Sequence, residues 1–307
     1  MVGPARCEGS PVGALAPGGP GVVGRRVHGW SGDRQRILVQ VVGSGVTGAP
    51  NVLEQISLDT GRVASRFKLP NQVVATQYTR PGGTSLLADD FAAGSVDRYD
   101  LTGHLQRVFA PASAELPSPR GTFVVTGTKS GLDQISNTGI IMRRIRIQGD
   151  LCGPVRWWTA TTVLADCSAA SESSTDRLWL VPLDGGPAVP VTPALRPHGL
   201  FQGYVNAWRI GGRLYLEADN AREVVSIVRQ DRDGSRHAIS VPGPAGYSDD
   251  IATVFDGRLL LQSNLGIGGP WSLFWFNPAT RTVSFIFRAP AHAYGVAGVI
   301  PYGYRTG

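Results

Sequence analysis

Hydrophobic and polar residues alternate in short runs along most of this chain, and many runs end at a Gly, Pro, Asn or Asp. Runs of this kind are typical of β-strands, and no stretch has the 3.6-residue spacing of an amphipathic helix. The first 34 residues differ, because they are rich in Gly and Pro and lack a hydrophobic period. We therefore expect a flexible lead-in at 1–34 and one all-β domain at 35–307.

The strand pattern repeats along this domain. Four segments, beginning near residues 73, 153, 201 and 249, each contain two hairpins in succession. The expected turns between third and fourth strands fall near Gly61, Gly103, Gly149, Gly186, Gly234 and Thr280. A period of about 40–50 residues with four strands per repeat is typical of β-propeller blades.

The two ends of the chain complete the count of blades. The first repeat has only three candidate strands, at 36–42, 52–58 and 62–69, and one further candidate strand remains at 294–303. If this C-terminal strand becomes the inner strand of blade one, every blade has four strands and the ring has no open edge. We predict a six-bladed propeller closed in this way, with seven blades as the alternative.

Two of the three cysteines flank one predicted hairpin. Cys152 comes just before the stretch VRWWTATTVLADCS (155–168), and Cys167 lies near its end. Antiparallel neighbours in a hairpin lie close enough for a disulfide, so we predict a bridge between these two residues. A structural disulfide indicates an extracytoplasmic location, with a cytoplasmic one as the alternative. The N-terminus has no continuous apolar segment of a signal peptide, and we interpret it as incomplete.

Paired acidic residues are the candidate metal or ligand contacts. Asp89 and Asp90 follow one predicted strand, and Asp249 and Asp250 precede another. Such strand ends can point toward the channel of a propeller, where carboxylates can hold calcium. Because no further acidic ligands follow at a known spacing, solvated turn residues are the favoured interpretation, and no cofactor is expected.

Adjacent tryptophans are the other candidate ligand contacts. Trp157 and Trp158 must face opposite sides of their strand, since side chains alternate along a strand. Packing between blades is favoured over a platform on which a ligand stacks. The glycines at 43, 45 and 48 form a G-x-G-x-x-G, but a β-like run follows them instead of a helix, so they do not predict a nucleotide site.

The charge of the chain is positive without a clear basic surface. The net charge is +6, and Lys68 and Lys129 are the only lysines among 29 basic residues, a bias that resembles GC-rich bacteria. The arginines of MRRIRIQ (142–148) alternate with apolar residues as on a solvated strand, without aromatic residues for base stacking, so nucleic acid is not expected. No run approaches the ~18 apolar residues of a transmembrane segment.

Three stretches resemble the TolB-like, WD40-like propeller repeats of exported bacterial proteins. They are LPSPRGTFVVTG (116–127), RWWTATTVLADC (156–167) and DRLWLVPLDGGPAVPVTP (176–193). Arg120 stands where the S-P-D-G turn of that family has an acid. The resemblance implies a binding or scaffolding role in the cell envelope without catalysis.

We therefore expect a monomeric propeller that recognises a protein, peptide or glycan on its ring face. One alternative is a small-molecule hydrolase or lyase-like propeller that uses a metal in its channel. Another is a redox propeller that binds a sugar or a quinone.

Overall fold

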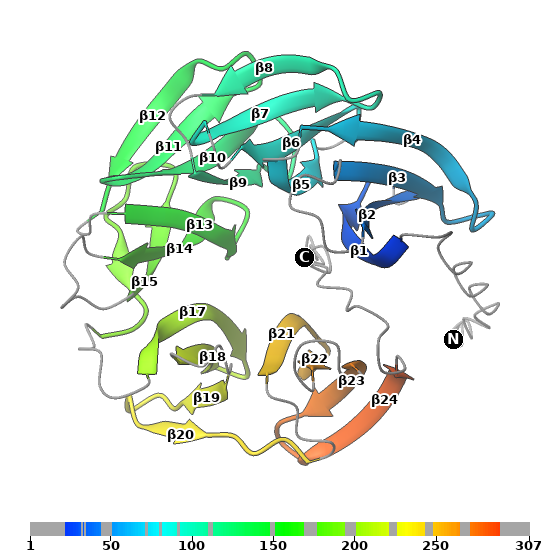
Figure 1. Cartoon of the computed structure of the whole chain (residues 1–307). Helices are drawn as coiled ribbons and strands as arrows, with labels where there is room; N and C mark the ends of the chain where they lie inside the picture. Colours follow the sequence, from blue (N-terminus) through cyan, green and yellow to red (C-terminus); the bar gives the residue numbers. More distant parts are fainter. Residues whose placement is uncertain are drawn as a thin grey trace, which may run out of the picture.

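The computed structural model contains six four-stranded antiparallel sheets arranged in a ring, which is a six-bladed β-propeller (Figure 1). This confirms the six-bladed prediction over the seven-bladed alternative. The structure describes residues 22–31, 33, 35–43, 51–70, 73–79, 82–90, 93–109, 113–147, 151–168, 177–193, 201–220, 226–242, 248–264 and 271–288. Across these ranges there is no helix, and therefore none long and apolar enough to span a membrane.

Within each blade the four strands lie side by side in sequence order, and in Figure 1 the first strand is nearest the centre of the ring. Blade one contains β1 (Val22–Trp30), β2 (Arg36–Gly43), β3 (Asn51–Ser57) and β4 (Val63–Leu69). Blade two contains β5 (Val73–Tyr78), β6 (Ser85–Asp90), β7 (Ser95–Asp100) and β8 (Leu105–Phe109). Blade three contains β9 (Ser113–Pro117), β10 (Phe123–Thr128), β11 (Gly131–Ser136) and β12 (Ile141–Arg146).

The other half of the ring has the same order of strands. Blade four contains β13 (Leu151–Trp157), β14 (Thr162–Ser168), β15 (Arg177–Pro182) and β16 (Val189–Pro190). Blade five contains β17 (Phe201–Ile210), β18 (Arg213–Asn220), β19 (Ser226–Gln230) and β20 (Arg236–Ala238). Blade six contains β21 (Ser248–Phe255), β22 (Arg258–Asn264), β23 (Trp271–Asn277) and β24 (Thr282–Arg288).

The inner strand of blade one is not the one that we expected. β1 occupies this position and pairs with β2, from Val22 opposite Gly43 to Trp30 opposite Ile37. The prediction that the C-terminal strand fills this position is therefore wrong, and segment 294–303 lies outside the described residues. β1 also begins inside the stretch that we expected to be a lead-in. Gly24 and Gly29 interrupt its hydrophobic pattern, so no clear strand signal is present there.

One predicted turn also lies elsewhere. We expected the turn between the third and fourth strands of blade three near Gly149, but β11 and β12 are joined at 137–140, and Gly139 has a positive φ of 79°. Gly149 comes after β12 and is outside the described residues. The fourth strand of this blade therefore has six residues, including Arg143 and Arg144. The turn was expected too late in the sequence because exposed apolar residues follow Gly139, and these resemble the continuation of a strand.

Apolar side chains fill the spaces between neighbouring blades. In β15, Trp179 and Val181 belong to a buried cluster shared with blade three, whereas Leu178 belongs to one shared with blade five. Because side chains alternate along a strand, both faces of a blade are covered. Among the described residues, clusters of this kind join blades one and two, two and three, three and four, four and five, and five and six.

Polar contacts also cross these interfaces. Gln77 donates to the carbonyl oxygen of Glu115 between blades two and three, at 2.6 Å. Between blades five and six, the backbone N–H of Ile251 donates to Glu217. Buried polar groups cost free energy unless they are paired, so these contacts fix which atoms of adjacent blades meet.

Candidate functional site

The two cysteines lie directly opposite each other. Cys152 in β13 pairs in register with Cys167 in β14, and their sulfur atoms are bonded, which confirms the predicted disulfide. Both residues are buried in the cluster between blades three and four. The bridge therefore joins the two inner strands of blade four, at the end of the hairpin opposite to Trp157 and the turn that follows it.

Trp157 and Trp158 face different blades, as the strand geometry predicts. Trp157 is buried against blade three, where its indole N–H donates to the carbonyl oxygen of Pro117 at 2.8 Å. The ring of Phe123 meets it edge-on at 6.0 Å between ring centres. Trp158 packs against the cluster that blade four shares with blade five, and its ring is half-buried. Of the two candidates, only Trp158 retains a surface for a ligand.

Trp158 belongs to a column of alternating arginine and tryptophan side chains. The guanidinium carbon of Arg156 lies 5.0 Å from the centre of the Trp158 ring and 3.8 Å from that of Trp208. The guanidinium of Arg209 lies on Trp158 as well, at 5.4 Å. Cations over indole faces are attracted by the negative face of the ring. We call Arg209, Trp158, Arg156 and Trp208 the arginine–tryptophan column.

Arg156 is the buried centre of this column, with 8% of its surface exposed. Its Nε donates to the carbonyl oxygen of Ala207 at 3.0 Å, its Nη2 donates to the same atom, and its Nη1 donates to the carbonyl oxygen of Trp157 at 3.2 Å. A buried guanidinium needs such partners, because an unpaired buried charge is strongly unfavourable. Arg209, at the other end of the column, is exposed. The column therefore has a fixed inner end and an open outer end.

The column lies at one end of the ring. Each blade has turns after its first and third strands, and in an up-and-down sheet these turns share one end, which we call the hairpin face. Trp158 lies in such a turn of blade four, and Arg209 lies just before the equivalent turn of blade five. Ile210 of blade five lies next to the equivalent turn of blade six. That turn contains Gly257, and a Cβ added to Gly257 would lie 4.0 Å from Ile210.

A second arginine–aromatic stack lies in blade six. The guanidinium of Arg258 lies 5.2 Å from the centre of the Trp275 ring, and Phe255 contacts the same ring at 6.2 Å between centres. Phe255 is 44% exposed, which is high for an aromatic residue. Arginine and aromatic side chains thus recur on the hairpin face from blade four to blade six.

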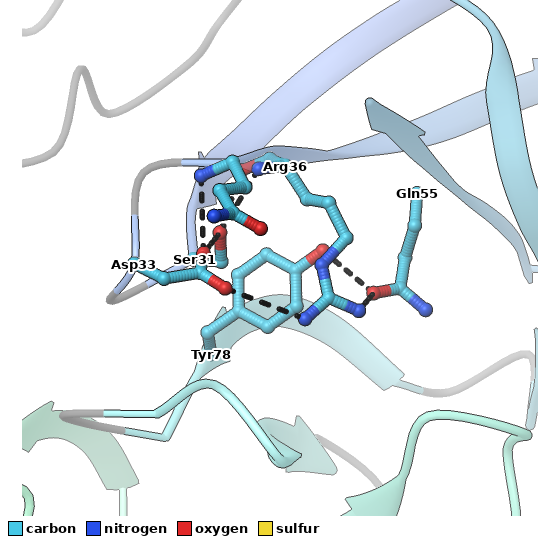
Figure 2. A network of polar contacts seen from close by, with 6 residues as sticks. Ser31, Asp33, Arg36, Gln55 and Tyr78 are labelled. Atoms are coloured by element: carbon cyan, nitrogen blue, oxygen red, sulfur yellow. Dashed lines mark hydrogen bonds and ion pairs between the residues drawn. The ribbon is translucent and has the colours of Figure 1, made fainter. Parts of the chain in front are cut away.

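Blade one has a polar network at the corresponding turn (Figure 2). The hydroxyl of Tyr78 in blade two donates to Oε1 of Gln55 at 3.1 Å, and Nη1 of Arg36 donates to the same oxygen at 3.4 Å. Asp33 contacts Arg36 at 3.7 Å and accepts a hydrogen bond from Ser31 (Figure 2).

Burial and hydrogen bonding shift the pKa values of two members of this network in opposite directions. Desolvation raises the pKa of Tyr78, whereas the hydrogen bond from Ser31, and then the N–H of Gln35, lower the pKa of Asp33. The tyrosine therefore remains a neutral donor and the aspartate an acceptor at neutral pH. The network connects blades one and two, and we assign it a structural role.

The predicted acidic residues are not all brought together. Asp90 is buried, and its Oδ1 accepts the N–H of Ala93 at 3.0 Å, so it caps its turn from a buried position and not from a solvated one. Asp249 and Asp250 lie in β21, opposite Ser263 and Gln262, but their side chains are outside the described part of the structure. Blades two and six are not adjacent in the ring, so the pair Asp89 and Asp90 and the pair Asp249 and Asp250 belong to separate, non-neighbouring sheets (Figure 1).

Asp89 instead lies near a residue that the sequence did not single out. It faces blade three, because it is opposite Val96, and Val96 packs into the cluster between these blades. Burial, and then the Asp89 carboxylate, raise the pKa of Glu115 in β9 well above its usual value. Burial and the neighbouring carboxylate therefore both favour the protonated form of Glu115. Among the described residues, no three His, Cys, Asp or Glu side chains lie together as metal ligands.

Sequence reasoning also missed Arg156 and Arg209. One signal was present, because an arginine in the otherwise apolar run PVRWW must either turn outward or find buried partners. The partner carbonyl of Ala207 lies in the next blade, however, so the sequence pattern of one hairpin does not identify it.

No protein-family model matches this sequence, and no curated protein matches it. The structure is similar to hydrazine synthase from Kuenenia stuttgartiensis, with 12% identity, a TM-score of 0.56, and coverage of 89% of this chain and 87% of that one. It is similar to virginiamycin B lyase from Staphylococcus aureus, in a catalytically inactive form with quinupristin, with 14% identity, a TM-score of 0.54 and coverage of 89% and 85%.

A prolyl endopeptidase is also similar, with 12% identity and a TM-score of 0.54. The match covers 86% of this chain but only 42% of that protein. At these identities the comparisons show the propeller fold alone, because one propeller architecture supports many activities. The TolB-like resemblance of the repeats stays a prediction.

Proposed function

We propose that this protein is a non-catalytic binding propeller of the bacterial cell envelope, and that it holds a peptide or protein ligand on its hairpin face. The observation that carries the proposal is the arginine–tryptophan column. Its ring nearest the surface, Trp158, lies between the buried Arg156 and the exposed Arg209. Tryptophan and arginine are the residues that most often dominate protein interfaces.

The fixed inner end of the column favours binding. Arg156 is held by carbonyl oxygens of blades four and five, so the Trp158 ring above it has little freedom to lose when a ligand binds. Preorganised aromatic side chains bind more tightly because less conformational entropy is lost. Arg209 is exposed and can pair with an acceptor of the ligand. A monomer suffices for this role.

The location follows from the disulfide. A bridge between Cys152 and Cys167 in the buried cluster of blade four supports an oxidising compartment, since cytosolic thiols are kept reduced. We propose an extracytoplasmic protein on this ground. A glycan ligand and a lyase-like or hydrolytic activity are the alternatives, and the following experiment tests whether a bound peptide is cleaved.

The test begins with a phage-displayed peptide library selected against the oxidised protein. Affinities of the selected peptides are then measured by fluorescence anisotropy for the wild type, Trp158→Ala and Met142→Ala. Met142 is the matched control, because it is an apolar residue, 57% exposed, on the outer strand of blade three. We expect Trp158→Ala to weaken binding about tenfold or more and Met142→Ala about twofold or less.

Thermal unfolding of each variant checks that the fold is intact. If no selected peptide depends on Trp158 in the folded variant, the hairpin face is not the binding site and the proposal is wrong. Mass spectrometry of each peptide after incubation tests the non-catalytic part. An unchanged mass supports it, whereas cleavage of the peptide shows an enzyme.

A further inference from the structure

A hollow of about 470 Å³ lies on the hairpin face of blade five. It is formed where the turn between β17 and β18 meets the turn between β19 and β20, and its lining residues are Gly211, Arg213, Asp231, Arg232 and Asp233. Its position on the turns leaves it accessible from the surface. The question is which chemical group this lining would accept.

Arginine side chains are concentrated around the hollow. Nε of Arg213 contacts Oδ1 of Asp231 at 3.0 Å, and Nη2 of Arg229 contacts Oδ2 at the same distance. His237 approaches Oδ2 to 3.5 Å. Asp231 thus holds two guanidinium groups, and its single charge does not balance both. Because Arg213 is bound through Nε and is 56% exposed, its Nη atoms remain for a ligand.

Arg232 supplies the second cation of the lining. Its guanidinium lies over the turn between β17 and β18, where a Cβ added to Gly212 would approach Nη2 to 2.9 Å. Gly212 has a positive φ of 80°, so this turn both requires glycine and leaves room for the arginine. Among the described residues, Arg232 has no ion-pair partner. It is therefore positioned at the hollow by packing, with its charge uncompensated.

The remaining carboxylate is engaged within its own turn. Asp233 accepts hydrogen bonds from the N–H of Ser235 at 2.9 Å and from its hydroxyl at 2.6 Å. The lining itself holds two arginines and two aspartates, and Arg229, which pairs with Asp231 beside it, adds a third guanidinium, so the cluster around the hollow carries a net positive charge. A cation is thereby disfavoured, and a group with two oxygen atoms in a plane matches the fork of donors of a guanidinium.

We infer that this hollow binds carboxylate groups, and that it takes the acidic side chains of a peptide held on the hairpin face. The inference rests on the proposed function, because the peptide as ligand comes from there. The inference adds that the peptide ligand is acidic and that it contacts the hairpin face at a second point besides Trp158. Arg213 and Arg232 would both donate to the carboxylate.

The experiment uses a fluorescein-labelled hexaglutamate peptide as the probe and a hexaglutamine peptide of the same length as its uncharged control. Anisotropy titrations are run with the wild type, Arg213→Gln, Arg232→Gln and Arg62→Gln. Arg62 is the matched control, since it is an exposed arginine next to the turn between the third and fourth strands of blade one. Arg232→Gln leaves the ion pair of Asp231 intact, so its result does not depend on how the cluster tolerates Arg213→Gln.

We expect hexaglutamate to bind and hexaglutamine not to bind. Arg213→Gln and Arg232→Gln should each weaken hexaglutamate binding about tenfold, as expected for a charge-assisted hydrogen bond, and Arg62→Gln about twofold or less. Equal weakening by all three variants would show diffuse attraction to a basic protein and overturn the site. Polygalacturonate is titrated as a second probe. If it binds through Arg213 while hexaglutamate does not bind, the site takes the carboxylates of a glycan and the inference of a peptide ligand is wrong.

The two proposals fail separately. If hexaglutamate binding does not depend on Arg213 and Arg232, but selected peptides still depend on Trp158, the carboxylate site is wrong and the proposed function stands. If no peptide depends on Trp158 but hexaglutamate depends on both arginines, the carboxylate site stands and the role of the column is wrong.

Discussion

The guanidinium carbon of Arg156 lies 3.8 Å from the centre of the Trp208 ring, so that a charged side chain of blade four is sandwiched against blade five. The same guanidinium donates to the carbonyl oxygen of Ala207, the residue just before this tryptophan. A charge at the buried interface of two blades is thus satisfied by two backbone carbonyls, those of Ala207 and Trp157, and by two indole faces. The packing of blade four against blade five therefore depends on Arg156.

Arg156→Met should lower the free energy of unfolding by about 2–3 kcal/mol, because the carbonyl of Ala207 loses its donors in a buried place. Arg209→Gln should cost less than about 1 kcal/mol, since Arg209 is exposed and contributes one cation–π contact. Urea unfolding monitored by tryptophan fluorescence measures both. Equal losses in the two variants would contradict the distinction between a buried and an open end of the column.

Removal of the disulfide should destabilise the protein without changing its fold. The bridge closes a loop with a sequence separation of 15 residues. A loop of this length stabilises the folded state by about 3 kcal/mol in the chain-entropy model. We expect the double variant Cys152→Ser/Cys167→Ser to lose about this amount in urea unfolding. Mass mapping of non-reduced peptides should recover the two cysteines linked, and alkylation of both without reductant would contradict the bridge.

The propeller itself was predictable from the sequence, for a physical reason. Each blade is built from strands adjacent in the chain, so the turn residues and the alternation of side chains are local signals. The disulfide was predictable in the same way, because a hairpin brings Cys152 and Cys167 opposite each other. β1 was missed because Gly24 and Gly29 weaken the strand pattern, and its place in blade one is decided by pairing with β2.

The candidate site was far less predictable, because it lies between blades. Trp158 was identified from the sequence, but Arg209, which contacts it, comes from the next blade. Glu115 has no motif around it, and its raised pKa comes from burial between blades and then from Asp89 in another sheet. Contacts of this kind depend on how the sheets face one another, which alternation along one strand does not encode.

Gly131→Ala should be one of the most destabilising alanine substitutions in the chain. Gly131 begins β11 with a φ of +146°, and a Cβ there would lie 2.0 Å from the carbonyl oxygen of Ile145 in the paired strand. The backbone of β12 must move, which should cost about 3 kcal/mol. Gly61→Ala is the matched control, since its φ is +64° and no atom lies within 4 Å of the added Cβ.

The control should cost only about 1 kcal/mol, which is the penalty of a left-handed conformation for an L-residue. Both variants are compared by urea unfolding. If they lose the same free energy, steric overlap with Ile145 contributes nothing, and β12 is free to shift away from β11.

Glu115 should make the protein less stable as the pH rises. Burial, followed by the Asp89 carboxylate, raises its folded-state pKa above the usual value of 4.5. The folded state then holds a proton that the unfolded state has lost. This contribution to the free energy of unfolding is complete below about pH 4.5 and decreases as the pH rises toward the folded-state pKa. Glu115→Gln removes the ionisable group while keeping a side chain of similar size.

We therefore expect Glu115→Gln to be more stable than the wild type at about pH 8, with the difference shrinking toward about pH 4. Glu54→Gln should instead be less stable than the wild type at about pH 8, because buried Glu54 accepts hydrogen bonds from Nε and Nη2 of Arg66 at 3.1 and 2.6 Å and the substitution weakens this charged pair. Urea unfolding at several pH values measures both variants against the wild type. If the gain from Glu115→Gln does not change with pH, then Glu115 titrates like an exposed glutamate and Asp89 does not act on it. Asp89→Asn separates the two causes of the raised Glu115 pKa. It removes the neighbouring carboxylate, so the part of the pH dependence that this carboxylate causes should be lost. The part that burial causes should remain.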